Sequence, residues 1–219
     1  GCHHQTMTDD GSRPRAPGFR TGRMEAFSDG VFAIAITLLV LEIAVPAGSE
    51  DDLLQALVDQ WPSYLGYLVS FSTIGAAWIG HTVITEHLDR ADPVFLRLNM
   101  LLLLVVSFLP FPTRLLAEYT VDANAERVAA TFYGINLLLT MTMLSVLWRH
   151  AVRRQLVRPD LADDDVKTLT KRLTPTLGVY VVMILVGLLV PTVAVLGYLV
   201  LAVFILVPFG ALRRRSSQG

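Results

Sequence analysis

Several features that mark common functional classes are scarce or missing in this sequence. Its 219 residues include one cysteine, Cys2, so neither an internal disulfide framework nor a thiolate metal cluster is possible. Only 17% of the residues are charged, the net charge is −1, and the basic residues are spread over separate segments, which argues against nucleic-acid binding. The sequence also has no G-x-S-x-G, HExxH, P-loop or Rossmann fingerprint, and therefore gives no support for an enzyme.

The histidines do not form a recognisable metal site. His81, Glu86 and His87 follow the pattern HxxxxEH, which does not place the two histidines on adjacent helical turns as HExxH does. His3 and His4 lie in a polar stretch, and we interpret residues 1–6 as a tag remnant because Met7 is a natural start. We expect no metal and no cofactor.

Apolar residues are abundant instead. They make up 53% of the chain, and the mean hydropathy of +0.53 is too high for an ordinary soluble domain of this length. About 20 helical residues cross a hydrocarbon core of roughly 30 Å. We predict an all-α integral membrane protein with six transmembrane helices, at residues 23–45, 61–86, 94–118, 128–148, 175–190 and 192–212. The last two come from one uncharged run that is about twice as long as a span, and Pro191 is the expected turn.

The charges between these segments predict the orientation. Sixteen of the eighteen Lys and Arg residues fall on one side of a six-span layout, and only Arg114 and Arg127 fall on the other. Since basic loops stay in the cytoplasm, both termini are predicted to be cytoplasmic. The expected organisation is a flexible N-terminal tail (residues 1–22), a channel-forming membrane domain (residues 23–212) and a basic C-terminal tail (residues 213–219).

The first apolar segment has two distinct faces. At 100° per residue, one stripe carries apolar residues, including Ile34, Leu38 and Leu41 at the i, i+4, i+7 spacing of a packed or symmetric interface. Thr37 lies at the edge of this stripe. Asp29 points well over 100° away from its centre, and a carboxylate inside a span is normally retained only where it meets protein or water. We therefore expect Asp29 to contact another helix of the same protein.

The same segment carries a family resemblance. Arg23, Phe27, Ser28 and Asp29 form the pattern RxxxFSD, followed by GVFAIAITLLVLEI, and this block resembles the first transmembrane helix of the bacterial homologues of the lysosomal potassium channel, the transmembrane protein 175 family. The resemblance implies a homotetramer whose first helices line a central pore. By position, Ile34, Leu38 and Leu41 would form its apolar constriction.

The resemblance also implies a hydrogen-bonded network behind the pore helix. It would join Arg23, Ser28 and Asp29 to Trp78 and His81 of the second span, two residues that lie one helical turn apart. The simpler alternative is that Trp78 only packs and that His81 is an ordinary interior histidine. Asn99, near the start of the third span, is a further candidate for bonding between helices. Pro110 and Pro112 should bend that span, either as a hinge or as a static kink.

These features together predict a passive, potassium-preferring cation channel of the cell membrane. Its partners would be further copies of the chain, membrane lipids and monovalent cations. The sequence lacks a TVGYG filter, so selectivity would depend on the narrow apolar constriction, with Thr37 hydroxyls ordering water or K⁺ near it. Glu42, toward the outer end, could form a cation-attracting ring, face lipid or pair between subunits. Two other classes stay open: a proton-coupled transporter that uses Asp29 or His81 as its carrier, and an oligomer that passes no ions.

Overall fold

The computed structural model describes residues 20–44, 48, 52–118, 123–159 and 163–215. Within these ranges every secondary-structure element is a helix, and a single isolated β-bridge pairs Leu88 with Val157. The prediction of an all-α protein is therefore confirmed. The elements are α1 (Gly22–Leu38), the 3₁₀ helix η1 (Leu39–Glu42), α2 (Leu53–Asp59), α3 (Trp61–Glu86), α4 (Pro93–Ser107), α5 (Pro110–Glu118), α6 (Ala123–Arg153), α7 (Asp163–Leu189) and α8 (Pro191–Arg215).

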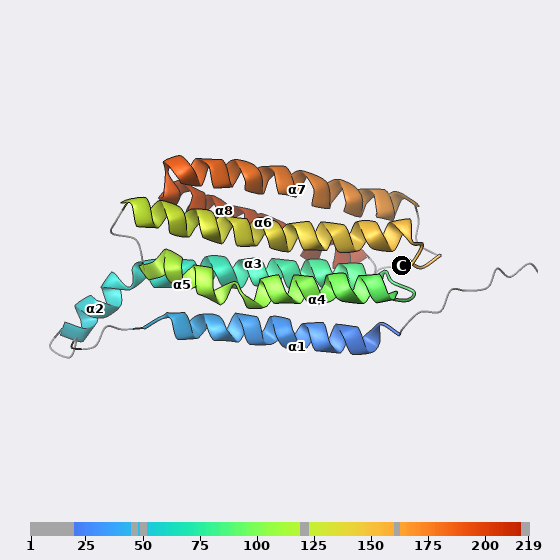
Figure 1. Ribbon diagram of the computed structural model, residues 1–219, viewed down its shortest axis with the longest axis horizontal. Helices are drawn as coiled ribbons and strands as arrows, with labels where there is room; N and C mark the ends of the chain where they lie inside the picture. The colour runs from blue at the N-terminus through green and yellow to red at the C-terminus, as the bar shows by residue number, and fades with distance from the viewer. Residues whose placement is uncertain (1–19, 45–47, 49–51, 119–122, 160–162, 216–219) are drawn as a thin grey trace, which may run out of the picture.

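The long helices form an up-and-down bundle. They run roughly along one axis, and the N-terminal end of α1 lies at the same end of the molecule as the C-terminal end of α8 (Figure 1). Four helical segments in the described ranges are long and apolar enough to cross a membrane: Gly22–Glu42, Trp61–Glu86, Pro93–Glu118 and Asn124–Arg153. The chain is thus a multi-pass membrane protein. Two shorter apolar stretches, Leu177–Leu189 and Pro191–Phe204, correspond to the predicted fifth and sixth spans.

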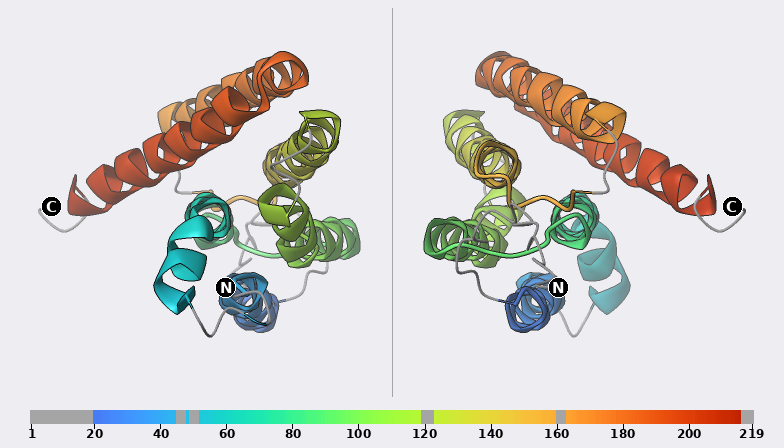
Figure 2. Two further views of the ribbon diagram at one scale, coloured as in Figure 1. Left: turned by 90° about the vertical axis from the view of Figure 1, so that its left-hand side faces the viewer. Right: turned by 90° about the vertical axis from the view of Figure 1, so that its right-hand side faces the viewer.

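Packing places α1 at one edge of the bundle. It contacts α3 and α4, whereas α6 packs against α4, α5 and α7, and α8 contacts α3 and α7. The hairpin of α7 and α8 crosses the other helices obliquely (Figure 2). Gly134 of α6 permits a close approach of α8, because a Cβ atom there would collide with the Tyr198 hydroxyl. Since α1 is covered on one side only, much of its surface stays available.

The third predicted span is divided into α4 and α5 near Pro110. Pro110 has no amide hydrogen, and the Leu109 amide bonds the Val106 carbonyl at 3.1 Å, as in a 3₁₀ turn, so the Val105 carbonyl loses its usual partner. Asn136 of α6 donates to this carbonyl at 3.3 Å. A neighbouring helix therefore satisfies the group that the bend frees, which agrees with the interpretation of a static kink.

The start of α4 is fixed by a side chain from the connection before it. Asp92 accepts a hydrogen bond from the Phe95 amide at 2.6 Å, and Nε2 of His150 lies 3.0 and 2.9 Å from its two carboxylate oxygens. Burial alone would raise the pKa of Asp92, but the Phe95 amide, His150 and Arg154 together hold this pKa below its usual value. The N-terminus of α4 is thereby tied to the C-terminal turn of α6.

Several predicted boundaries differ from the observed ones. The first helix changes to 3₁₀ geometry after Leu38 and ends at Glu42 rather than Val45. The connection between the first and second predicted spans contains α2, whose start is capped by the Asp52 carboxylate accepting from the Gln55 amide at 3.2 Å. α7 begins at Asp163, in the connection between the fourth and fifth predicted spans, and α8 continues through Arg215 into the predicted C-terminal tail. Residues 1–19 of the predicted N-terminal tail and 216–219 of the C-terminal one lie outside the described ranges.

Candidate functional site

The two faces of α1 meet different surroundings. One row of residues at helical spacing is buried against α3 and α4: Met24, Ser28, Phe32, Ala35 and, at the start of η1, Leu39. The opposite surface is apolar yet uncovered in the single subunit. One face of α1 therefore anchors the helix in its own bundle, and the other remains for lipid, partner subunits or a pore.

A buried polar chain holds the anchored face. Asn99 of α4 donates through Nδ2 to Oγ of Ser28 at 2.9 Å, and its Oδ1 lies 2.8 Å from Nε2 of His81 on α3. Ser28 in turn donates to the Met24 carbonyl at 2.8 Å. All three side chains are at most 1% exposed. The Asn99 amide uses its NH₂ group toward α1 and its oxygen toward α3, so this one side chain of α4 connects the three helices.

Asp29 takes part in a separate contact. Nε1 of Trp78 donates to its Oδ1 at 2.9 Å, which joins α1 to α3 at a more exposed position than the Asn99 chain. No hydrogen bond joins His81 to Asp29 in the described structure, and the His81 ring lies tilted by 48° against Phe32, with 5.6 Å between centroids. The structure thus brings together Ser28, Asp29, Trp78 and His81 as two links rather than as one network.

Arg23 and Phe27, the other two residues of the RxxxFSD pattern, lie apart from these links. Among the described residues, Arg23 makes no ion pair or side-chain hydrogen bond, and Phe27 is 53% exposed on the uncovered face. The sequence pattern therefore spans both faces of α1.

The proposed constriction residues lie on the uncovered face. Ile34 is 60%, Leu38 41% and Leu41 71% exposed, so three large apolar side chains of one stripe are uncovered in the single subunit. Thr37 is also exposed, and its hydroxyl donates to the Ile34 carbonyl at 2.9 Å. That bond uses the hydroxyl hydrogen and leaves the oxygen lone pairs on the same side of the helix free to accept or to coordinate.

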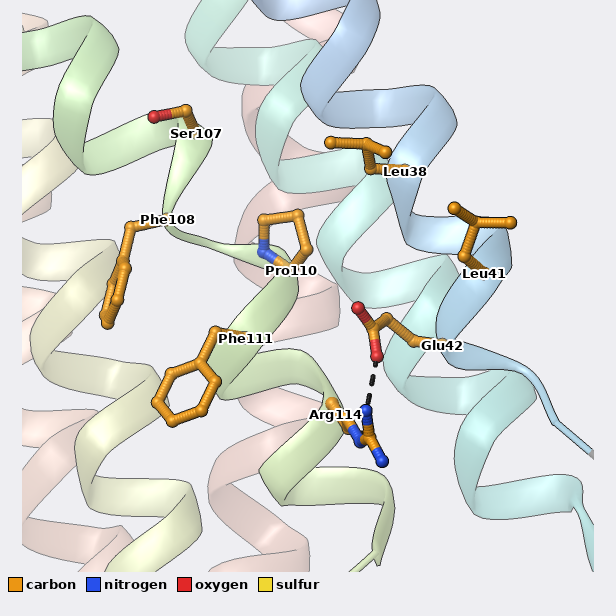
Figure 3. A pocket seen from close by; sticks show the side chains of 8 residues that line it. All are labelled: Leu38, Leu41, Glu42, Ser107, Phe108, Pro110, Phe111 and Arg114. Carbon is orange, nitrogen blue, oxygen red and sulfur yellow. Dashed lines mark ion pairs between the residues drawn. The ribbon is translucent and has the colours of Figure 1, made fainter.

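The C-terminal end of α1 and the 3₁₀ helix η1 that follows it border a cavity of about 300 Å³. Leu38 and Leu41 line it from one side, and residues around the α4–α5 bend line it from the other (Figure 3). Glu42 lies 4.0 Å from Arg114 of α5, which also lies 3.5 Å from Glu118. Glu42 is thus paired within its own subunit.

No group of three metal-binding side chains occurs within the part of the chain that the structure describes. His87, one of the three residues of the HxxxxEH pattern, bonds the Val83 carbonyl through Nδ1. The site offers apolar side chains, the Thr37 hydroxyl and two polar links that hold α1 against α3 and α4.

Comparison with known proteins agrees with this arrangement. Residues 23–110 match the family described as endosomal/lysosomal potassium channel TMEM175. A protein from Chamaesiphon minutus that is named a potassium channel is 44% identical over 166 residues, which cover 74% of this chain and 81% of the relative. The chain belongs to the TMEM175 family. A second TMEM175-type relative, a Streptomyces collinus protein also named a potassium channel, is 46% identical over 61% of this chain and 65% of its own length.

A solved structure extends the likeness to the fold. The crystal structure of a lysosomal potassium-selective channel TMEM175 homolog from Chamaesiphon minutus superposes with a TM-score of 0.79 at 40% identity, covering 86% of this chain and 97% of that chain. The match includes most of the helices described above. Membership in the TMEM175 family therefore rests on both the sequence and the three-dimensional arrangement.

Sequence reasoning missed two details of the site. Asn99 was recognised as an interhelical candidate but not as the bridge between Ser28 and His81, although a polar residue in an apolar helix is the signal that points to such a bridge. The pairing of Glu42 with Arg114 could not be predicted from a local sequence pattern. The two residues are far apart in the chain, and the bend at Pro110 lies between α4 and the helix that carries Arg114.

Proposed function

We propose that this protein is a potassium-conducting channel of the cell membrane, assembled as a homotetramer with α1 of each subunit around a central pore. Six membrane helices per subunit would place both termini in the cytoplasm. The observation that carries the proposal is the uncovered apolar stripe on a helix whose opposite face is anchored by buried hydrogen bonds. The Chamaesiphon minutus and Streptomyces collinus relatives, which are named potassium channels, support the same function.

Ile34, Leu38 and Leu41 form the constriction in this proposal. A cation passing branched apolar side chains must keep or shed its water without a charged replacement, so conduction depends steeply on pore radius and wetting. The Thr37 hydroxyls face the same passage and offer oxygen atoms to the ion or its water. K⁺ is preferred because it loses its hydration shell at lower cost than Na⁺.

Ser28, Asp29, Trp78 and His81 have an architectural role in this proposal. Arg23 and Phe27 are assigned the same role through the family resemblance of the RxxxFSD pattern alone. The Ser28–Asn99–His81 chain and the Asp29–Trp78 bond keep α1 at a fixed rotation, so that the constriction residues point to the axis. A pore only a few Å wide requires this precision, since a rotation by one residue would move a different side chain into the passage.

The test is ion flux from purified protein in liposomes, first under a K⁺ gradient and then under a matched Na⁺ gradient. Wild-type protein should pass K⁺ in preference to Na⁺ without saturation, and Ile34→Asn should raise flux and weaken the preference. Val40→Asn, at a position of the same segment that is 53% exposed but lies off the stripe, is the matched control and should alter flux less.

Two other outcomes would each overturn the proposal. Saturable flux that requires a pH gradient would identify a proton-coupled transporter. An intact oligomer that passes neither ion in both proteins would identify a structural assembly.

A further inference from the structure

Three charged side chains from η1 and α5 lie in a row beyond the C-terminal end of α1. Glu42 closes η1, Arg114 lies on the first turns of α5, and Glu118 follows one turn later. The Arg114 Nε atom lies 4.0 Å from the Glu42 carboxylate and 3.5 Å from that of Glu118. Figure 3 shows Glu42 and Arg114 directed toward each other across the cavity beside Leu38 and Leu41.

Glu42 is the charge nearest to the proposed constriction at this end. It directly follows Leu41, the most exposed of the three constriction residues. Four copies of an unpaired carboxylate around the pore axis would attract cations to the entrance. The Arg114 guanidinium lies 4.0 Å from Glu42 and 3.5 Å from Glu118, so its positive charge offsets part of the negative charge of the two carboxylates, and the entrance contributes less attraction than they would alone.

We propose that Arg114 limits cation conductance by neutralising Glu42 at the outer mouth of the pore. This inference rests on the proposed function, because it requires α1 to line a conducting pathway. Arg114 thus acts on permeation through Glu42, without itself touching the ion in the constriction.

The exposure of the pair makes an electrostatic role more important than a structural one. The Arg114 side chain is 63% exposed and that of Glu42 22% exposed. Ion pairs with such access to water add little to stability. Their field nevertheless reaches a nearby ion at low salt, since the screening length is about 30 Å at 0.01 M ionic strength and about 3 Å at 1 M. A field effect must therefore disappear as the salt concentration rises.

Single-channel currents in planar bilayers test this inference, with symmetric KCl at low and high concentration. At about 10 mM, Arg114→Gln should raise conductance about two- to fourfold, less than the roughly 10- to 1,000-fold that electrostatic focusing reaches in charged clefts, and at about 1 M it should match wild type. Glu42→Gln should lower conductance at low salt. The double variant Arg114→Gln/Glu42→Gln removes one charge of each sign and should return close to wild type.

Two further variants show which charged group produces the field. Arg114→Lys keeps the charge and should behave as wild type, which a role based only on the guanidinium shape would not allow. Arg114→Gln/Glu118→Gln should keep most of the gain, because Glu118 lies farther from the constriction along α5.

The inference is overturned if Arg114→Gln conducts like wild type at low salt, if its gain persists at 1 M, or if Glu42→Gln does not suppress that gain. The proposed function fails differently, since wild-type protein would then carry no K⁺ current at any salt concentration. A wild-type current with unchanged Arg114→Gln currents would leave the channel standing and remove only the role of Arg114.

Discussion

Replacing Asn99 tests the polar chain that anchors α1. Asn99→Leu keeps the side-chain volume close to the original but removes both the donor to Ser28 and the acceptor for His81. Ser28 keeps its bond to the Met24 carbonyl, whereas Nε2 of His81 loses its only polar partner in the described structure. The main loss is therefore one buried group left without a partner.

The size of the stability loss follows from this one unpaired group. A buried polar group without a partner costs about 1–3 kcal/mol, and interhelical bonds in membranes reach at most about 1.7 kcal/mol in measured cases. We expect Asn99→Leu to lower the free energy of unfolding by about 2 kcal/mol. For a chain of this length that lowers Tm by roughly 4–8 °C.

The assay is thermal unfolding of the detergent-solubilised protein, followed by the fraction that still elutes as the intact oligomer in size-exclusion chromatography. Thr82→Val is the matched control, because Thr82 is exposed on α3 and its hydroxyl bonds only the Trp78 carbonyl of its own helix. Its Tm should stay close to wild type. Ser28→Ala combined with Asn99→Leu should cost less than the sum of the two single changes.

Two results would refute the reasoning. One is an unchanged Tm for Asn99→Leu, which would mean that the chain contributes nothing to the bundle. The other is full additivity of Ser28→Ala and Asn99→Leu, since partners in one hydrogen bond share a common loss.

Three further predictions concern other parts of the structure. Asp29→Ala leaves the Trp78 Nε1 atom without its acceptor, so the yield of assembled oligomer should fall before ion preference changes; a normal yield with altered K⁺ to Na⁺ flux would contradict this. Because the pKa of Asp92 is lowered in the folded protein, its charge stabilises the fold above about pH 4, and this contribution is lost as the pH falls further. Asp92→Asn should therefore flatten the decline of Tm between pH 6 and 3. A decline as steep as that of wild type would exclude this role of Asp92. Gly134→Ala should cost about 1–3 kcal/mol by colliding with the Tyr198 hydroxyl, and Tyr198→Phe should restore part of the lost Tm; no rescue would place the collision elsewhere.

The helical membrane class could be read from the sequence because it depends on local composition. Long apolar runs fix the spans, since a backbone in hydrocarbon must satisfy its own hydrogen bonds. The break at Pro110 and the turn before Pro191 were also predictable, because each proline removes a donor at a known position. Helix ends were less predictable: α1 changes to 3₁₀ geometry after Leu38 without a proline or glycine to signal it.

The faces of the first helix were partly determined by the sequence as well. Periodicity separated Ile34, Leu38 and Leu41 from Asp29, and the structure leaves those three side chains exposed while Asp29 meets Trp78. Periodicity gives the angle between residues on one helix. Periodicity carries no information about which neighbouring helix packs against each face.

Only the tertiary structure decided the partners. Asn99 bridges Ser28 and His81 because α4 packs against α1 beside α3, and Arg114 reaches Glu42 because the bend at Pro110 turns α5 toward η1. These contacts join residues that are distant in the chain, and their geometry depends on helix rotation and crossing. The sequence thus determined that α1 has one anchored and one open face, and the packing of the bundle determined which side chains anchor it.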